Sequence, residues 1–174
     1  MSLFVLSQIL VGIAICTDIL SFQFKERKHI VYCLLVSCTL ISVHFMCLNR
    51  WTAACLGLVA TLRFATSLFS TSKIFMAIFI TASVIFSALT YEGLLSILGC
   101  TGAIFGTTAS FCKEDKQLRQ LMFIGTSFWL VHNYLAGSPG AVLMESLFIG
   151  SNLVGYFRYY IRPRKQAMVS PANK

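Results

Sequence analysis

Seven apolar stretches, each about as long as a bilayer is thick, follow one another with very little chain between them. They cover residues 3–24, 29–48, 51–70, 74–91, 93–112, 118–136 and 140–161. A helix that crosses the hydrocarbon core of a membrane needs about 20 mostly apolar residues. The connectors (KERK, NR, TSK, YE, KEDKQ and GSP) are too short to hold a soluble domain. The sequence therefore predicts an all-α integral membrane protein with seven transmembrane helices.

The composition supports this prediction. Apolar residues make up 57% of the chain and charged residues only 11%, and the mean hydropathy is +0.78. Soluble globular domains carry about 45–50% apolar and about 25% charged residues. The first stretch lacks the basic segment that precedes the apolar run of a signal peptide, so we expect it to be retained as a span. The polar, proline-containing segment 162–174 is predicted to be a disordered cytoplasmic tail.

The positive charges predict which way the chain crosses the membrane. Short loops rich in Lys and Arg favour the cytoplasm. If the N-terminus lies outside, only Arg50 falls on the outer side, and Arg63 falls within the third stretch. The inner loops and tail then hold Lys25, Arg27, Lys28, Lys73, Lys113, Lys116, Arg119, Arg158, Arg162, Arg164, Lys165 and Lys174. We therefore expect a multi-pass protein with an outer N-terminus and a cytoplasmic C-terminus. Because this topology explains the net charge of +8, a nucleic-acid partner is not predicted.

The chain repeats itself at an offset of 88 residues. KERK at 25–28 matches KEDK at 113–116, and Val-His ending at His44 matches Val-His ending at His132. The same offset carries the first three apolar stretches onto the last three, which predicts a parallel repeat about an axis along the membrane normal. The predicted units are a first three-helix repeat (1–72), a linker helix (73–91), a second three-helix repeat (92–161) and the tail (162–174).

This plan of three, one and three helices with an outer N-terminus resembles the SWEET and PQ-loop transporter superfamily. The segments SFQFKERK and NLVGYFRYYI resemble the YgjV-type family of bacterial inner-membrane proteins, which is related to that superfamily. The resemblance implies a SWEET-like bundle in the inner membrane. It also implies a pocket that pairs a Trp with a residue sixteen positions later, here Trp129 and Glu145.

The chain departs from the superfamily in two ways. Its Pro-Gln pair is missing, because no Pro precedes Gln23, and no apolar stretch has Pro in its interior. Hinges at prolines are therefore in doubt. The first repeat has Ile41 and Gly57 where the second has Trp129 and Glu145, so a sugar site made of paired Trp and Asn residues is not predicted.

Glu145 and His132 are the polar residues that most suggest a site. A charged side chain at the centre of a bilayer costs about 2.5–3.5 kcal/mol by insertion scales and usually faces a bundle interior or a water cavity. Glu145 lies about 8 Å, and His132 about 6 Å, from the outer ends of their predicted helices. We expect these two, with Trp129, Asn133 and the repeat partner His44, to bind a solute or a proton. The alternative is an interhelical hydrogen bond that only holds two helices together.

Two more charges lie inside predicted spans. In the resembled fold the first and third helices of a repeat are neighbours, so Asp18 and Arg63 are predicted to form an intramembrane ion pair. A purely structural pair is an alternative, and so is an Arg63 side chain that extends to the inner surface.

The sequence offers no enzyme chemistry. It lacks HExxH, GxSxG and P-loop motifs, and its seven cysteines form no CxxC pair. No enzyme activity, catalytic residue, cofactor or metal site is predicted. Two functions remain: a transporter of a small polar or cationic solute, and a scaffold or sensor subunit that keeps the bundle without transporting. The oligomeric state stays open.

Overall fold

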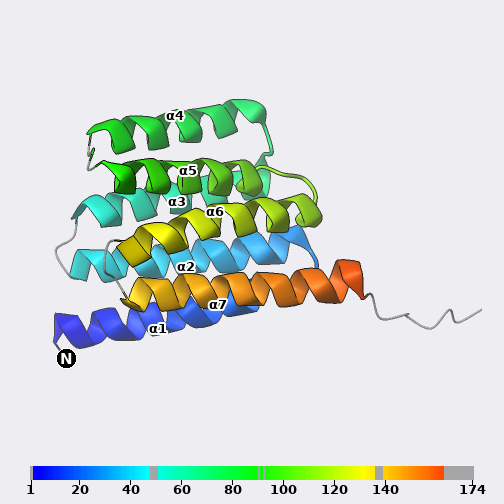
Figure 1. The fold of residues 1–174 in the computed structure, drawn as a ribbon, viewed down its shortest axis with the longest axis horizontal. Coiled ribbons are helices and arrows are strands. Elements are labelled where there is room, and N and C mark those ends of the chain that lie inside the picture. Colours follow the sequence, from blue (N-terminus) through cyan, green and yellow to red (C-terminus); the bar gives the residue numbers. More distant parts are fainter. Residues whose placement is uncertain (1, 48–50, 90, 92, 136–138, 163–174) are drawn as a thin grey trace, which may run out of the picture.

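The computed structural model describes residues 2–47, 51–89, 91, 93–135 and 139–162, without the side chains of residues 45, 51–56 and 139–141 (Figure 1). Within these ranges the chain is helical and contains no strand. The helices are α1 (Leu3–Ser21), α2 (Arg27–Cys47), α3 (Trp51–Phe69), α4 (Lys73–Leu89), α5 (Leu94–Ser110), α6 (Asp115–Leu135), α7 (Pro139–Tyr156) and the π-helical turn η1 (Phe157–Ile161). The prediction of seven helices is confirmed. Residues 163–174 of the predicted tail lie outside the described residues.

The helix ends follow from local chemistry. Ser2 accepts a hydrogen bond from the Val5 backbone N–H at 3.3 Å and caps the start of α1. Gly93 precedes α5 with a φ of 74°, which suits glycine because it has no Cβ. Asp115 lies in the first turn of α6, where a negative charge complements the helix dipole.

Six of these helices pack in a closed ring. Each helix in the order α1, α2, α3, α5, α6, α7 contacts the next, and α7 contacts α1. In Figure 1, α1, α2 and α3 form one layer and α5, α6 and α7 the other. Helix α4 lies outside the ring, against α5 and a small part of α3. Because α2 lies between α1 and α3, the first and third helices are not the packed neighbours that we expected.

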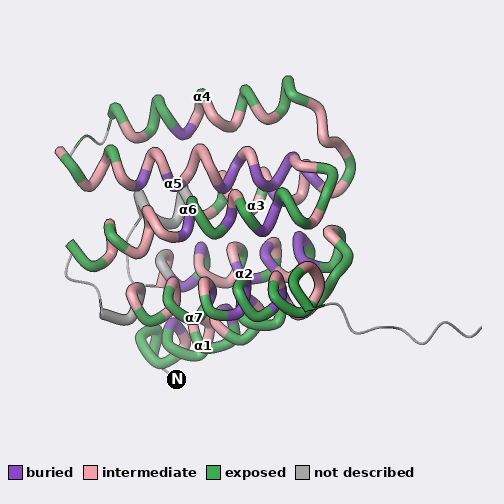
Figure 2. The backbone as a smooth tube through the Cα atoms, turned by 45° about the vertical axis from the view of Figure 1, so that its right-hand side comes forward, coloured by how far each residue is buried: buried purple, intermediate pink, exposed green. Residues whose placement is uncertain are grey.

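The bundle buries many polar side chains beside its apolar core and exposes many large apolar ones. Its buried polar side chains are one histidine, two formally charged residues, one amide and ten hydroxyls among the described residues: His44, Asp18, Arg119, Asn152, Ser7, Ser21, Ser37, Ser42, Ser67, Ser83, Thr107, Ser110, Thr126 and Ser151. Large apolar residues such as Ile74, Leu89 and Phe69 are mostly exposed, and α4 shows this outward face most plainly (Figure 2). This distribution is the reverse of that in a soluble protein and suits lipid as the surroundings.

Length and apolar character alone single out fewer spans than the whole bundle contains. By these two properties α1 is the one described helix that is long and apolar enough to cross a membrane. Helices α4 and α5 and the Gly57–Phe69 part of α3 are apolar but shorter. The inverted distribution of polar and apolar side chains is therefore the stronger sign of a membrane environment.

The two ends of the bundle differ in charge and packing. Helices α1, α3, α5 and α7 end where α2, α4 and α6 begin (Figure 1). We call this the basic end, because apart from Arg63 it holds every described Lys and Arg: Lys25, Arg27, Lys28, Lys73, Lys113, Lys116, Arg119, Arg158 and Arg162. The apolar core includes the first turns of α2 and α6, through Ile30, Leu34, Leu118 and Met122.

Candidate functional site

The predicted residues of α6 gather against α5. Trp129 packs over a face of α5 that lacks side chains: a Cβ added to Gly102 would lie 2.7 Å from its Cδ1, and one added to Gly99 would lie 3.3 Å from its Cη2. Small residues allow such close helix packing in membranes. The His132 ring meets the Trp129 ring edge-on, with 5.1 Å between centroids. The His132 Nδ1 lies 3.1 Å from the Asn133 Oδ1. Trp129, His132 and Asn133 thus form one partly exposed cluster.

Glu145 does not join this cluster through a polar contact. No hydrogen bond or ion pair links it to His132 among the described residues. His44 lies elsewhere too: its Nδ1 is 2.8 Å from the Ser7 carbonyl oxygen, in the buried interface between α1 and α2. The five predicted site residues are therefore divided among three places.

Glu145 lies instead near the charges of the ring interior. The Cys38 thiol on α2 is close enough to Asp18, Arg63 and Glu145 for the charges of all three to act on it. The charge of Asp18 also acts on Glu145, and the Asp18 side chain is buried. Three helices thus place a charged group toward the interior of the ring: α1 places the Asp18 carboxyl, α7 the Glu145 carboxyl and α3 the Arg63 guanidinium. We call Asp18, Arg63 and Glu145 the interior charge group.

Arg63 is directed across the ring rather than toward Asp18. Its Nη1 donates to the Thr107 Oγ1 on α5 at 3.0 Å. The guanidinium lies over Gly106, where an added Cβ would make an ordinary contact, 3.7 Å, with both terminal nitrogens. No ion pair joins Asp18 and Arg63 among the described residues, so the predicted pair is not formed in this structure. The reason is that α2 separates α1 from α3, whereas α3 packs directly on α5.

Sequence reasoning missed the role of two arginines that it assigned to the inner loops. Arg119 is 0% exposed and donates to the carbonyl oxygens of Phe22, at 2.8 Å, and Phe24. Arg27 donates to the carbonyl oxygens of Ser67, at 2.9 Å, and Ser110. The signal was available for Arg119, because it lies inside the predicted span 118–136 and a charge there needs internal partners.

The described part of the chain offers no metal cage. The described residues contain no group of three or more His, Cys, Asp or Glu side chains that could bind a metal ion. Two carboxyls beside one guanidinium carry a net negative charge when all three are ionised. Such an interior favours a cation, a proton or a polar solute with an amino group.

The comparisons with known proteins agree on one family. The Imp-YgjV family model, described as bacterial inner membrane protein, matches residues 5–163. This chain belongs to that family. An Escherichia coli (strain K12) relative, "Inner membrane protein YgjV", is 28% identical over 149 residues, which cover 84% of this chain and 81% of the relative. No solved structure matches the chain.

Membership in the Imp-YgjV family places the protein in the bacterial inner membrane and makes the lipid bilayer its partner. The predicted YgjV-type resemblance is confirmed, whereas the relation to the SWEET and PQ-loop superfamily stays a prediction. The exposed apolar side chains of the ring and of α4 accordingly face lipid.

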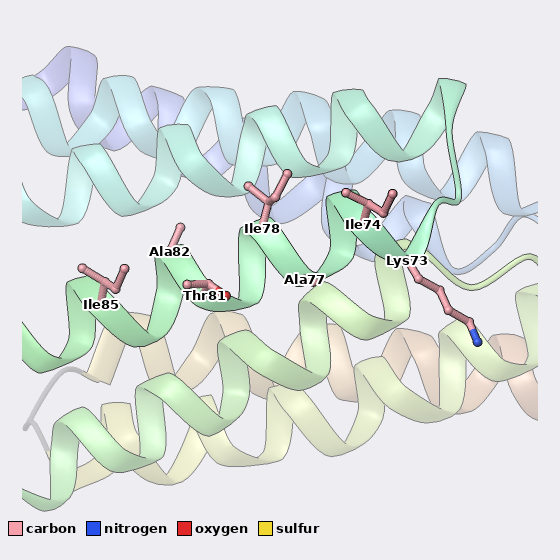
Figure 3. A pocket seen from close by; sticks show the side chains of 7 residues that line it. All are labelled: Lys73, Ile74, Ala77, Ile78, Thr81, Ala82 and Ile85. Carbon is pink, nitrogen blue, oxygen red and sulfur yellow. The ribbon is translucent and has the colours of Figure 1, made fainter.

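A shallow groove along α4 belongs to this lipid-facing surface. Figure 3 shows the side chains that line it: Lys73, Ile74, Ala77, Ile78, Thr81, Ala82 and Ile85. Apart from Lys73 at the start of the helix and Thr81, these residues are apolar. The groove has no cluster of polar groups that would orient a solute, so the interior charge group is the better candidate site.

Proposed function

We propose that this Imp-YgjV protein transports a small polar or cationic solute through the centre of its helix ring. The interior charge group carries this proposal. Asp18 and Glu145 come from different helices, α1 and α7, and neither has an ion pair among the described residues. Intramembrane acids are costly and usually mark substrate, ion or proton pathways.

We further propose a parallel repeat of three helices with α4 as the linker. Two contacts between the layers support it. The Ser151 hydroxyl of α7 donates to the Ile19 carbonyl of α1, and Arg63 of α3 donates to Thr107 of α5. Positions 63 and 151 are 88 apart, as are positions 19 and 107. The same offset that matches the sequence segments thus relates the α1–α7 contact to the α3–α5 contact, as a pseudo-twofold axis requires.

The proposed orientation has the N-terminus outside and the basic end in the cytoplasm. All described Lys and Arg residues but one lie at that end, and positive charge favours the cytoplasmic side. In this orientation the cluster of Trp129, His132 and Asn133 lies toward the outer side. We propose that it lines the entrance to the interior, and that Glu145, deeper on α7, meets the solute or proton.

Thermal unfolding of the detergent-purified full-length protein tests this function. Sugars, amino acids, polyamines and metal ions are screened as added solutes. A solute that binds only the folded state stabilises it by RT ln(1 + [L]/Kd), about 2.7 kcal/mol at 100 times Kd. We expect a cationic or amino-bearing solute to raise the unfolding temperature. Glu145→Gln and Asp18→Asn should abolish the rise while leaving the unliganded protein folded.

Glu26→Gln is the matched control, because it removes an exposed carboxylate whose ion-pair partner within the described part of the chain is His29, at 3.5 Å. This variant should respond to the solute as the parent does. A response that survives Glu145→Gln and Asp18→Asn would remove the interior charge group from the proposal.

The second candidate function is a scaffold or sensor subunit without transport. It is favoured by the absence of Pro from the interiors of the apolar stretches, since the resemblance implies motion at prolines. It predicts no stabilising solute at any pH, and a Glu145→Gln variant whose only defect is a lower yield of folded protein. We propose no enzyme activity for either function.

A further inference from the structure

Arg27 ties the first layer of helices to the second at the basic end. It lies at the start of α2, and one terminal nitrogen donates both to the Ser67 carbonyl of α3, at 2.9 Å, and to the Ser110 carbonyl of α5. Ser67 and Ser110 are both buried near the ends of their helices. The guanidinium thus satisfies helix-end carbonyls that have no partner in their own helices.

Arg119 makes the corresponding tie from the second layer to the first. From α6 it donates to the carbonyls of Phe22 and Phe24, just past the end of α1. Its guanidinium lies 5.4 Å from the ring centroids of Phe22 and Tyr159. The Asn152 amide holds the same turn, because it donates to the Arg119 carbonyl at 2.7 Å.

The two arginine ties are related by the repeat. Their acceptors at positions 22 and 110 are 88 apart, and the two arginines sit on the second helix of each proposed repeat, one helical turn out of register. Position 155 is the repeat partner of 67. At Gly155 an added Cβ would collide with the Phe22 carbonyl and Arg119, so α7 passes Arg119 where α3 passes Arg27.

Buried apolar side chains lie close to the two arginines along α2 and α6. Ile30, Leu34, Leu118 and Met122 are all at most 5% exposed and belong to one cluster. Positions 30 and 118 are 88 apart, and so are 34 and 122. We call these four residues the apolar plug. It lies between the basic end and Cys38, one turn further along α2, where the interior charge group begins.

The arginine contacts and the apolar plug can close the basic end of the bundle and can also separate. Separating the layers would leave the carbonyls of positions 22 and 110 without donors, which is costly in an apolar setting and inexpensive in water. The end of the bundle is where water can reach them. Two arginines, each bonded to a backbone carbonyl of the other layer, together with a dry apolar plug give a closed state. Hydration of the same carbonyls and guanidinium groups gives an open alternative.

We propose that Arg27, Arg119 and the apolar plug form a gate that closes the interior charge group to the basic end in this conformation. The inference rests on the proposed transport, because a gate serves a solute pathway. It differs from a hinge at prolines, which this chain lacks inside its apolar stretches.

Accessibility of Cys38 tests the gate without any solute. The six other cysteines are replaced by serine, and a charged, membrane-impermeant methanethiosulfonate is added to membrane vesicles of either orientation. In the parent, Cys38 should react more slowly from the basic end than from the opposite end. Arg27→Gln and Arg119→Gln should each speed the reaction from the basic end about tenfold, a shift of about 1.4 kcal/mol in the opening equilibrium.

The matched controls remove a neighbouring exposed charge. Lys28→Gln changes the residue next to Arg27, and Lys116→Gln changes a residue one turn before Arg119. Neither lysine bridges the two layers through any contact among the described residues, and Lys116 lies over the Tyr160 ring of its own layer. Both should label as the parent does. Arg119→Lys keeps the charge without the two-pronged contact, so it should react at an intermediate rate and provides a folded variant if Arg119→Gln does not fold.

Each result bears on the gate separately from transport. Faster labelling in both arginine variants supports the gate, even if no solute ever stabilises the protein. Unchanged labelling in folded arginine variants would overturn the gate and leave Arg27 and Arg119 as static braces, even if a solute binds. Faster parental labelling from the basic end than from the opposite end would also overturn it.

Discussion

At the scale of single residues, the partners of a charge decide what it does. Lys28 and Arg27 are neighbours in the same basic cluster, yet Lys28 is exposed whereas Arg27 crosses to two other helices. Arg119 is a stronger case, because its side chain is completely removed from solvent, bonds carbonyls just past the end of α1, and lies 3.8 Å from the Asp115 carboxylate on its own helix. Buried guanidinium groups hold helix ends together only where the neighbouring backbone can approach closely.

Gly155 provides that approach and gives a direct prediction. Gly155→Ala places a Cβ against the Phe22 carbonyl and the Arg119 guanidinium, and a backbone carbonyl cannot move aside without shifting α1. We expect a loss of about 1–3 kcal/mol, as for other overpacked sites, seen as a lower unfolding temperature of the detergent-purified protein. Gly150→Ala on the same helix is the control, because nothing lies within 4 Å of its added Cβ. That variant should unfold at the same temperature as the parent or slightly higher; equal losses in both would contradict this account.

The sequence predicts residue types for a site better than it predicts their contacts. Depth along a helix predicted an internal setting for Asp18, Arg63 and Glu145, and of these Asp18 is buried whereas Arg63 and Glu145 are partly exposed. It did not show which helices are neighbours, so it paired Asp18 with Arg63, which contacts Thr107 instead. It also grouped His44 with the outer cluster, although a backbone carbonyl of α1 holds its ring. The contact partners of Asp18, Arg63 and His44 depend on which helices are neighbours in the bundle, and helical periodicity does not encode that order.

At the scale of helices, the ends of the described helices lie within a few residues of the ends of the predicted stretches. Apolar length and flanking polar residues determine where a stretch and its helix begin and end.

Helix α4 differs from the other helices in its position. It is outside the ring, faces lipid along the groove of Figure 3, and contacts mainly α5. Ser83 is its one buried residue among those described, so the seam between α4 and α5 depends on a small side chain there.

Enlarging Ser83 should weaken this seam. Ser83→Leu introduces bulk where α4 meets α5, and we expect a loss of about 1–3 kcal/mol. Val84→Leu, at a neighbouring position that is 44% exposed, should change stability by less than about 0.5 kcal/mol. Thermal unfolding of both variants provides the comparison. A Ser83→Leu variant as stable as Val84→Leu would mean that α4 does not pack tightly on α5.

At the scale of the whole molecule, the fold separates three environments. Lipid meets an apolar exterior, the ring encloses hydroxyls and the interior charge group, and the positive charges collect at one end. The three interior charges come from three helices, and Arg63 of α3 finds its partner Thr107 on α5, in the other layer, so that contact forms only when the two layers meet. Closure of the ring thus links the assembly of the membrane protein to the formation of its candidate site.

The collection of positive charge at the basic end predicts the topology of the assembled protein in the bacterial inner membrane. Alkaline phosphatase is active only after export, whereas green fluorescent protein fluoresces only in the cytoplasm. A fusion after Ile161 should therefore fluoresce with the second reporter and be inactive with the first. A fusion after Leu135, at the opposite end, should show the reverse pattern.

Lys and Arg near a short loop oppose its export. Replacing Lys113 and Lys116 by Gln should therefore weaken the preference for a cytoplasmic basic end. It should not reverse that preference, because Lys25, Arg27 and Lys28 still hold the first basic loop inside. An active phosphatase after Ile161 would place the basic end outside and assign the proposed gate to the other face of the membrane.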